Sequence, residues 1–378
     1  MGMYLNPGNS GFSRIRNDVY VDKSRLIQLV NETMETPRRL VCVSRPRRFG
    51  KSFAAKMLCA YYDKTCDSAS LFEDLKIASD SGAYEKHLNK YDVIYLDLAS
   101  VMEEAEEMEL VPFIKQELVR ELSLAYPQLN PKGSFLNVLL EAVEVTGNKF
   151  IMIIDEWDVP IREAPEYEKK YLRFLRSLFK NSSATDRIFA AAYMTGILPV
   201  KKDGSQSAIS DFQEFSMVSP GVFAEYVGFT EDEVKELCIK YARDFSMMKQ
   251  WYDGYVLENI GSVYNPNSVM RVVHNDKFCS YWAETSAAKS LLGYISLDFD
   301  GLSKTVAELL GGGAVKVNTV GFANDLVTFR DRDDVLTLLI HLGYLAYDRE
   351  KGYAWIPNEE IRIEFARSIT IMSRHCAV

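Results

Sequence analysis

Five short apolar runs alternate with longer helical stretches over roughly the first two hundred residues, and this alternation limits the fold more than any other feature. Most of the runs are apolar throughout, as in strands that are buried on both faces. The predicted strands are 39–44, 91–99, 149–156, 187–195 and 214–219. Between them, apolar residues recur at every third or fourth position, which is typical of amphipathic helices. These predicted helices are 51–63, 112–126, 135–146 and 166–181. The pattern predicts an α/β fold with a mostly parallel sheet of about five strands covered by helices.

Length, charge and cysteine content limit the number of domains and the classes of protein to which this chain can belong. A chain of 378 residues is long for one domain, so two or three domains are expected. The net charge of −9 argues against a surface coated in basic residues for nonspecific nucleic-acid binding. Six scattered cysteines without a C-x-x-C pair, and four histidines, indicate neither a zinc cage nor a disulfide framework. No signal peptide or apolar stretch of roughly 18 residues is recognisable, so we expect a cytoplasmic protein with no membrane partner.

The segment SRPRRFGKSF, residues 44–53, lies between a predicted buried strand and a predicted helix. Gly50, Lys51 and Ser52 match the second half of the phosphate-loop motif G-x-x-x-x-G-K-[ST], but Arg45 stands where the first glycine is expected. Such loops bind phosphate through main-chain N–H groups and the N-terminus of the following helix. Taken alone, GKS leaves two interpretations open: a phosphate loop that lacks its first glycine, or a chance match at a helix start.

A pair of acids about 100 residues downstream favours the phosphate loop. Asp155 and Glu156 end the predicted strand 149–156. In this arrangement Asp155 would lie beside an Mg²⁺ ion that is also held by the Ser52 hydroxyl, and Glu156 would polarise a water molecule for attack on the γ-phosphate. Two solvent-facing acids at a strand end are the alternative, but this alternative does not account for GKS and both acids in this order.

The nucleotide-binding hypothesis gives each candidate residue a role. The predicted ATP-binding residues are Arg45, Pro46, Arg47, Arg48, Phe49, Gly50, Lys51, Ser52 and Phe53. The predicted metal ligands are Ser52 and Asp155, and the predicted catalytic residues are Glu156, Lys51 and Thr195. Thr195 ends the strand 187–195 and would lie beside the γ-phosphate, although a turn-capping role before Gly196 is the alternative. Arg162, Lys201 and Lys202 are candidates for a transition-state cation, and the sequence does not choose among them.

Seven motifs follow one another along roughly residues 8–290. They are GFSRIRNDVYVDKSRLI at 11–27, RPRRFGKS at 45–52, IIDEWDVPI at 153–161, MTGILPV at 194–200, YVGFTEDEV at 226–234, WYDGY at 251–255 and VYNPNSV at 263–269. Together they resemble the AAA-ATPase-like family of bacterial proteins. In that family the phosphate loop itself contains R-P-R-R-F-G-K-S, so the resemblance makes Arg45 a family feature.

The resemblance implies a P-loop NTPase core of the catalytic-glutamate type, followed by a mostly helical lid and a winged-helix-like C-terminal region. We expect three parts: an ATPase core over 1–220, a lid region over 221–310 and a small module over 311–378. In the lid, Thr230 followed by Glu233 predicts a capping box. In the last part, 336–358 predicts a helix, a turn and a small hairpin.

Several other side chains in these motifs are given structural roles. The resemblance places Asp22 and Lys23 near an adenine or on the core, and we favour packing on the core. We interpret Trp251, Tyr252 and Tyr264 as core or domain-interface aromatics. Relatives often continue into a PD-(D/E)XK nuclease domain, but we find no D…E-x-K strand in a suitable setting, so no nuclease activity is assigned.

Three functions agree with these features. The first is an ATPase that uses Mg²⁺-ATP and couples its nucleotide state to the C-terminal half. The second is a nucleotide-binding module with little or no turnover that recruits a partner through 220–378, so a protein partner or self-association is plausible. The third is a small-molecule kinase, but 229–243 is acidic where an arginine-rich lid is expected. DNA contact by the winged-helix-like end stays possible, although 358–368 carries acids as well as arginines.

Overall fold

The structure is a computed structural model that describes residues 2–375, with the exception of 80, 106–107, 181, 201, 204–205, 208, 210, 258–259, 283–299 and 323–328. The chain divides into two compact units. Unit 1 contains residues 1–43 and 51–214, and unit 2 contains residues 44–50 and 215–378. The segment predicted to be a phosphate loop is therefore grouped with the C-terminal residues of the chain.

Unit 1 is built on a five-stranded sheet with the order β2-β3-β4-β1-β7. The strands are β1 (Leu40–Ser44), β2 (Asp92–Asp97), β3 (Phe150–Asp155), β4 (Phe189–Gly196) and β7 (Gln213–Phe215). Strands β2, β3 and β4 pair in parallel, with Asp97 opposite Asp155. The predicted α/β class is confirmed, and the largest difference in bounds is at β7, which ends four residues earlier than 219.

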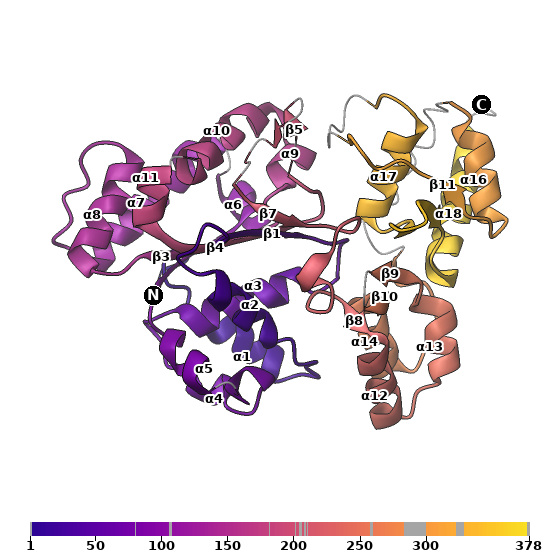
Figure 1. Ribbon diagram of the computed structural model, residues 1–378, viewed down its shortest axis with the longest axis horizontal. Helices are drawn as coiled ribbons and strands as arrows, with labels where there is room; N and C mark the ends of the chain where they lie inside the picture. The colour runs from indigo at the N-terminus through magenta and orange to yellow at the C-terminus, as the bar shows by residue number, and fades with distance from the viewer. Residues whose placement is uncertain are drawn as a thin grey trace. The chain divides into compact units, whose positions relative to one another are not determined.

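Helices cover both faces of this sheet (Figure 1). Those on one face are α1 (Ser10–Arg16), α2 (Arg25–Thr33) and α3 (Lys51–Tyr62), with α4 (Ala69–Phe72), η1 (Lys76–Ser79) and α5 (Ser81–His87) beyond them. Those on the other face are α6 (Leu98–Ala105), α7 (Leu110–Ala125), α8 (Phe135–Thr146), α9 (Val159–Glu163), η2 (Pro165–Tyr167), α10 (Glu168–Phe179) and α11 (Ser182–Ile188). A short hairpin of β5 (Lys202–Asp203) and β6 (Gln206–Ser207) follows β4.

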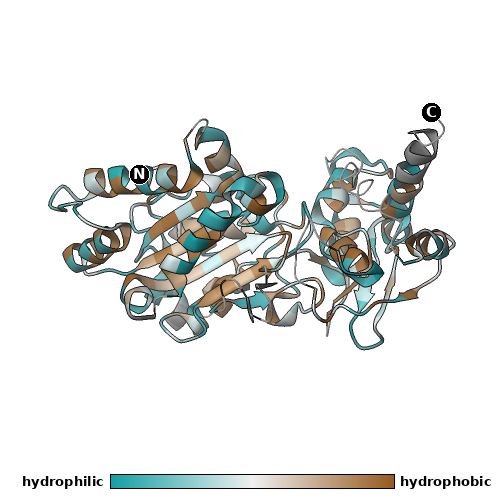
Figure 2. Ribbon diagram, turned by 90° about the horizontal axis from the view of Figure 1, so that it is seen from above, coloured by the Kyte–Doolittle hydropathy of each residue, from teal (hydrophilic) through white to brown (hydrophobic). Residues whose placement is uncertain are grey.

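Burial explains why the strands are apolar. Every residue of β1, β3 and β4 is buried, so polar residues could not alternate with apolar ones there. Figure 2 shows predominantly apolar strands, whereas the helices mix hydrophilic and apolar residues along their length. Because the carboxyl ends of parallel strands meet at one edge, polar residues that follow β3 and β4 are brought together there.

Unit 2 contains two small antiparallel sheets and several helices. The first sheet, ordered β8-β10-β9, consists of β8 (Phe229–Thr230), β9 (Tyr255–Leu257) and β10 (Gly261–Tyr264). The second, ordered β11-β13-β12, consists of β11 (Val315–Lys316), β12 (Ala346–Asp348) and β13 (Tyr353–Trp355). The helices are η3 (Gly221–Phe223), α12 (Glu231–Tyr241), α13 (Phe245–Tyr252), α14 (Pro266–Asn275), α16 (Leu302–Leu310), α17 (Arg332–Leu342) and α18 (Glu359–His375).

Local predictions for unit 2 are confirmed at several points. Thr230 and Glu233 form the predicted capping box at the start of α12. The hairpin expected near the C-terminus is formed by β12 and β13. Tyr252 and Tyr264 are completely buried, as expected of core aromatics. The winged-helix assignment and the three-part division stay predictions.

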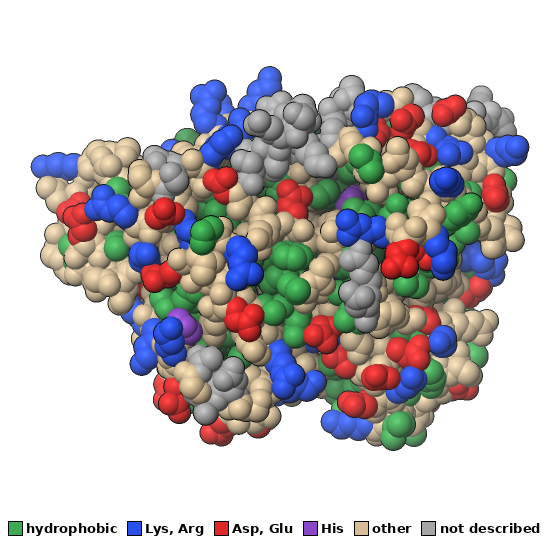
Figure 3. All heavy atoms as spheres, viewed as in Figure 1, with side chains coloured by type: hydrophobic (Ala, Val, Ile, Leu, Met, Phe, Trp, Pro, Cys, Tyr) green, Lys and Arg blue, Asp and Glu red, His purple; other side chains and the backbone are tan. Residues whose placement is uncertain are grey.

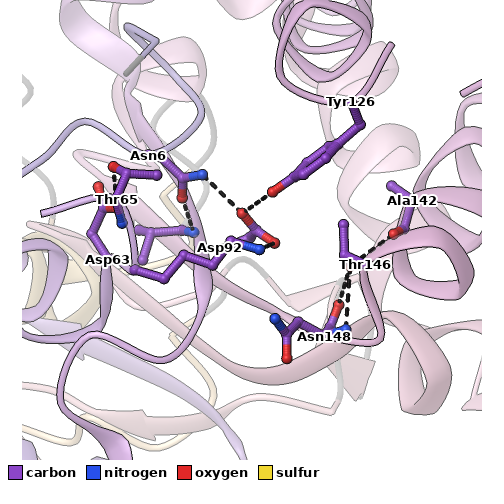
Figure 4. A network of polar contacts seen from close by, with 10 residues as sticks. Asn6, Asp63, Thr65, Asp92, Tyr126, Ala142, Thr146 and Asn148 are labelled. Atoms are coloured by element: carbon purple, nitrogen blue, oxygen red, sulfur yellow. Dashed lines mark hydrogen bonds and ion pairs between the residues drawn. The ribbon is translucent and has the colours of Figure 1, made fainter. Parts of the chain in front are cut away.

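The amino-terminal end of β2 carries a buried polar network (Figure 4). Asp92 is completely buried, and its carboxylate accepts hydrogen bonds from Asn6 Nδ2 at 2.8 Å, Lys64 Nζ at 2.7 Å and the Tyr126 hydroxyl. Nearby, buried Asp63 accepts from Gly8 N at 2.6 Å and from the backbone N–H and hydroxyl of Thr65. Each of these two acids therefore has three donors within hydrogen-bond distance.

The visible surface carries both signs of charge. Figure 3 shows Lys and Arg side chains interspersed with Asp and Glu over both units. Among the described residues, no helix combines the length and the apolar character that crossing a membrane requires.

Candidate functional site

The two predicted metal ligands meet at the carboxyl end of β3. Asp155 is the last residue of that strand and is completely buried. The Ser52 hydroxyl, in the first turn of α3, donates a hydrogen bond to the Asp155 carboxylate. The Tyr95 hydroxyl, on the neighbouring strand β2, contacts Asp155 Oδ2 at 3.5 Å. The structure thus brings Ser52 and Asp155 together, and their role as metal ligands stays a prediction. The sequence gave no reason to select Tyr95.

Burial shifts the pKa values of two charged residues at this point. Burial lowers the pKa of Lys51 to about 8, and the negative charges of Asp155 and Glu156 oppose this shift. Burial also raises the pKa of Asp155 to about 6, against the hydrogen bond from Ser52. Lys51 and Asp155 are both buried away from water, and burial disfavours the charged form of each side chain. A bound metal–phosphate group would supply the opposite charge to each of them, so these residues fit Mg²⁺-ATP.

Glu156 has an unusual backbone conformation. It is partly exposed and has φ = +52°, in the left-handed region that a glutamate seldom occupies. Backbone strain of this kind is concentrated at functional sites, where the surrounding structure maintains it. The next residue, Trp157, donates its backbone N–H to the carbonyl of Thr195 at 3.0 Å. This bond joins the turn after β3 to the end of β4.

Thr195 is completely buried, and its Oγ1 has no hydrogen-bond partner among the described residues. The indole Nε1 of Trp157 is also buried and without a partner there. A buried polar group without a partner costs about 1–3 kcal/mol, so such a group calls for an explanation. An oxygen of a bound phosphate or of a water molecule would satisfy either group, and the role of Thr195 stays a prediction.

Asp158 is a further candidate that the sequence reasoning missed. It is completely buried, and its carboxylate accepts hydrogen bonds from Leu198 N at 3.0 Å, Ile197 N at 3.2 Å and Arg162 Nε at 2.8 Å. A signal was present, because Arg162 lies four residues after this third acid of DEWD, a spacing at which helical side chains pair. The partners at 197 and 198 could not be inferred from spacing.

The candidates for a transition-state cation are only partly described. Arg162 pairs with Asp158 through Nε and with Glu163 through Nη1 at 3.1 Å. Its Nη2 atom is buried and has no partner among the described residues. Lys201 lies outside the described residues, and the side chain of Lys202 is not described.

The loop between β1 and α3 makes its side-chain contacts within unit 2. Arg45 is completely buried, and its guanidinium donates to the carbonyl oxygens of Ser44 at 2.9 Å, Phe215 at 3.1 Å and Phe223 at 3.5 Å. Arg48 Nη1 donates to the carbonyl of Tyr281 at 3.4 Å. The guanidinium groups of Arg45 and Arg48 are thus engaged with backbone carbonyl groups.

The apolar residues of the loop also pack within unit 2. The ring of Phe49 is buried and lies 5.4 Å from that of Tyr255 in an edge-to-face arrangement. A Cβ atom on Gly343 would lie 2.7 Å from Cβ of Pro46, so these two residues are in close contact. Gly50 has φ = +91°, which favours glycine at the last position before α3. Phe53, in α3, is 54% exposed. The ATP contacts of 45–53 stay predictions.

Asp22, which was weighed as an adenine neighbour, is half-buried. Its carboxylate accepts the backbone N–H of Ser24 at 2.8 Å and that of Lys76 at 2.7 Å. These bonds connect the start of α2 to η1. The choice between a position near an adenine and packing on the core stays a prediction.

The sheet order, the GKS helix start and the acid pair at the end of β3 define the α/β core of a P-loop protein. Residues 7–205, slightly more than half of the chain, match the model of a family described as "Predicted AAA-ATPase". The chain belongs to this family.

Individual relatives are distant. A protein of Azotobacter chroococcum mcd 1, described as "Uncharacterized protein in vnfD 5'region", is 24% identical over 304 residues, which cover 76% of this chain and 55% of the relative. This chain thus spans about half the length of that relative. Among solved structures, the ORC2 protein of Aeropyrum pernix shares 13% identity at a TM-score of 0.40, covering 97% of this chain and 98% of that one. Cdc6p of Pyrobaculum aerophilum shares 12% identity at a TM-score of 0.32, covering 95% and 98%. Scores this low add nothing to the fold, which rests on the sheet itself.

Proposed function

We propose that this protein binds Mg²⁺-ATP and hydrolyses it. The observation that carries the proposal is the hydrogen bond that joins Ser52, in the first turn of α3, to Asp155 at the end of β3. Lys51 and Glu156 adjoin these two residues in the chain, so four groups suited to phosphoryl transfer are close together. Membership in a family of predicted AAA-ATPases supports the same activity.

Each residue of the site has a defined task in this proposal. Lys51 contacts the phosphates, and Ser52 and Asp155 hold Mg²⁺, which would offset negative charge on the phosphate oxygens. Glu156 accepts a proton from the water molecule whose oxygen attacks the γ-phosphorus. The bond from that phosphorus to the bridging oxygen breaks, which yields ADP and inorganic phosphate. The Thr195 hydroxyl contacts the phosphate or the attacking water.

Turnover by Glu156→Gln tests the proposal. The substitution removes the proton acceptor with little change in size, so we expect kcat to fall about 10²- to 10⁴-fold while ATP affinity changes little. Lys51→Ala serves as the binding control and should lose ATP affinity. If the wild type and Glu156→Gln both bind ATP and both show near-zero turnover, hydrolysis is excluded. The alternative, a nucleotide-binding module that recruits a partner, would then be favoured.

We also propose that nucleotide state is coupled to the C-terminal half of the chain through the loop itself. Supporting this, Arg48 donates to the carbonyl of Tyr281, and the backbone N–H groups of Tyr281 and Trp282 donate to Glu360 of α18 at 2.8 and 3.1 Å. A displacement of the loop would therefore be transmitted through Tyr281 and Trp282 to Glu360 in α18. Hydrogen exchange at 278–282 should change on ATP binding in the wild type, and the change should be lost in Arg48→Ala. An undiminished change in that variant would exclude this route.

A further inference from the structure

Asp158 connects the two loops that carry the proposed catalytic groups. It follows Glu156 by two residues, and its carboxylate accepts the N–H groups of Ile197 and Leu198, which follow Thr195. All of these residues belong to unit 1. The carboxylate is completely buried, and Arg162 Nε provides its positive partner at 2.8 Å. A buried charge is retained only when it is paired and hydrogen-bonded, and both conditions are met here.

Gly196 allows the two loops to approach closely. A Cβ atom at this position would lie 2.5 Å from Asp158 Oδ1 and 2.7 Å from Cδ1 of Trp157. Side chains with Cβ contacts this short do not occur without displacement of one partner. Any residue larger than glycine would therefore have to displace the side chain of Asp158 or Trp157, and the contact places the turn after β4 directly against residues 157–158.

A second bond, made by the residue directly after Glu156, reinforces the connection. Trp157 N donates to the carbonyl of Thr195 at 3.0 Å, while Glu156 itself keeps a left-handed φ of +52°. Such a conformation costs of order 1–3 kcal/mol and persists only when the surroundings enforce it. The backbone of Glu156 itself donates to Asp155 Oδ1 at 3.1 Å and accepts from Val159 N at 3.0 Å, and the bonds from Trp157 and to Asp158 hold the two residues that follow it.

We propose that Asp158 is a positioning residue for the ATP hydrolysis proposed above, on which this inference rests. Its carboxylate holds the turn after β4 against residues 156–157, so that Glu156 and the Thr195 hydroxyl are aligned on the same attacking water. Asp158 itself contacts neither ATP nor Mg²⁺. Because reacting groups must be placed to within about 1 Å, loosening this contact lowers the rate far more than it lowers ATP affinity.

Asp63→Asn is a matched control for Asp158→Asn. Asp63 is as completely buried as Asp158, also accepts three hydrogen bonds, and lies at the opposite end of the sheet. We expect both substitutions to lower the free energy of unfolding, and Asp158→Asn to lower it more because Arg162 loses its carboxylate partner. Only Asp158→Asn should lower kcat, by at least about tenfold, with KM for ATP within about threefold of the wild type. Gly196→Ala is a second variant, which separates the loops without removing a charge and should give the same split between kcat and KM.

The Glu156→Gln background distinguishes positioning from general damage. A residue that acts through Glu156 has little left to align once that carboxylate is gone, so Asp158→Asn should lower the rate of Glu156→Gln by less than about twofold. Equal losses of kcat in Asp158→Asn and Asp63→Asn, or a tenfold loss that persists in the Glu156→Gln background, would overturn the proposal. So would a raised KM with unchanged kcat, since this would make Asp158 a binding residue.

Binding of ADP with aluminium fluoride separates this proposal from the function on which it rests. The wild type should bind ADP more tightly when aluminium fluoride mimics the transferring phosphoryl group, and Asp158→Asn should lose at least about tenfold of that preference while keeping its affinity for ADP alone. If the wild type shows neither turnover nor this preference, the proposed function fails. If the wild type shows both and Asp158→Asn retains them, only the positioning role fails.

Discussion

Two buried aspartates at opposite ends of the same sheet differ in the hydrogen-bond donors and cations that stabilise their negative charge. Asp92, at the start of β2, accepts hydrogen bonds from Asn6, Lys64 and Tyr126. Asp155, at the end of β3, has the Ser52 hydroxyl and a 3.5 Å contact from Tyr95, and burial raises its pKa to about 6. Both are completely buried. The amino-terminal end of the sheet is therefore built to be stable by itself, whereas the carboxyl end keeps a charge that a ligand would stabilise.

Two buried threonines show the same contrast. Thr185 in α11 donates its hydroxyl to the carbonyl of Leu178 at 2.7 Å. Thr195, at the carboxyl edge of the sheet, has no partner for its hydroxyl among the described residues. Native structures leave few buried polar groups unsatisfied, and each of those few calls for an explanation such as a catalytic role or a bound water or ion. The hydroxyl groups thus differ as the carboxylates do: Thr185 has a hydrogen-bond partner, whereas Thr195, at the carboxyl edge of the sheet, has none among the described residues.

The largest expected effect comes from replacing each aspartate by asparagine. Asp92→Asn breaks an ion pair with the half-buried Lys64 and should lower the free energy of unfolding by about 2 kcal/mol, because three hydrogen-bond donors lose their charged acceptor. Asp155→Asn should change that free energy by no more than about 1 kcal/mol, since burial already opposes the charge of Asp155. It should lower ATP turnover at least about 100-fold through loss of a metal ligand. Urea unfolding and phosphate release measure the two effects.

The proposed difference between the two ends of the sheet is wrong if Asp92→Asn lowers turnover or if Asp155→Asn strongly lowers stability. Asp92→Asn should retain full turnover per folded molecule, measured at a temperature where it stays folded. A loss of turnover there would mean that the two ends of the sheet are not independent. A strong loss of stability in Asp155→Asn would mean that its carboxylate stabilises the fold even without a ligand.

The sequence predicted what depends on local pattern. Buried strands are apolar throughout, so β1, β3 and β4 were located from composition, and Asp155 from its place at a strand end. The Thr230 capping box was found because both of its partners lie within one helical turn. Asp158 was missed because its acceptor role depends on Ile197 and Leu198, about forty residues away. The partners of Arg45, at 215 and 223, are even more distant in the chain and had no sequence signal.

Replacing the two threonines by valine should have intermediate effects of opposite kinds. Thr185→Val removes a satisfied hydrogen bond and leaves the Leu178 carbonyl without its donor, which should cost about 1 kcal/mol of stability and leave turnover unchanged. Thr195→Val removes an unsatisfied hydroxyl, so stability should stay the same or increase by up to about 1 kcal/mol. Its turnover should fall about tenfold, which is modest for a group that contacts the phosphate or water.

Thermal unfolding and steady-state kinetics on the same preparations measure both quantities. A Thr195→Val protein that is less stable and fully active would identify Thr195 as a turn residue. The difference between the two ends of the sheet would then rest on Asp92 and Asp155 alone, without Thr185 and Thr195.

The smallest expected effect concerns two tyrosines that contact the two aspartates. At low pH, kcat/KM should fall as Asp155 becomes protonated, because the neutral acid is a poor metal ligand, so the acid limb should lie near pH 6. Tyr95→Phe removes a hydrogen-bond donor to the charged form of Asp155, so the pKa of Asp155 should rise further. The acid limb should then move upward by about 0.3 pH units. Tyr126→Phe should cost about 1 kcal/mol of stability and leave the limb in place, because its hydroxyl contacts Asp92 instead. A limb that moves downward in Tyr95→Phe, or that moves at all in Tyr126→Phe, would show that the titrating group is not Asp155.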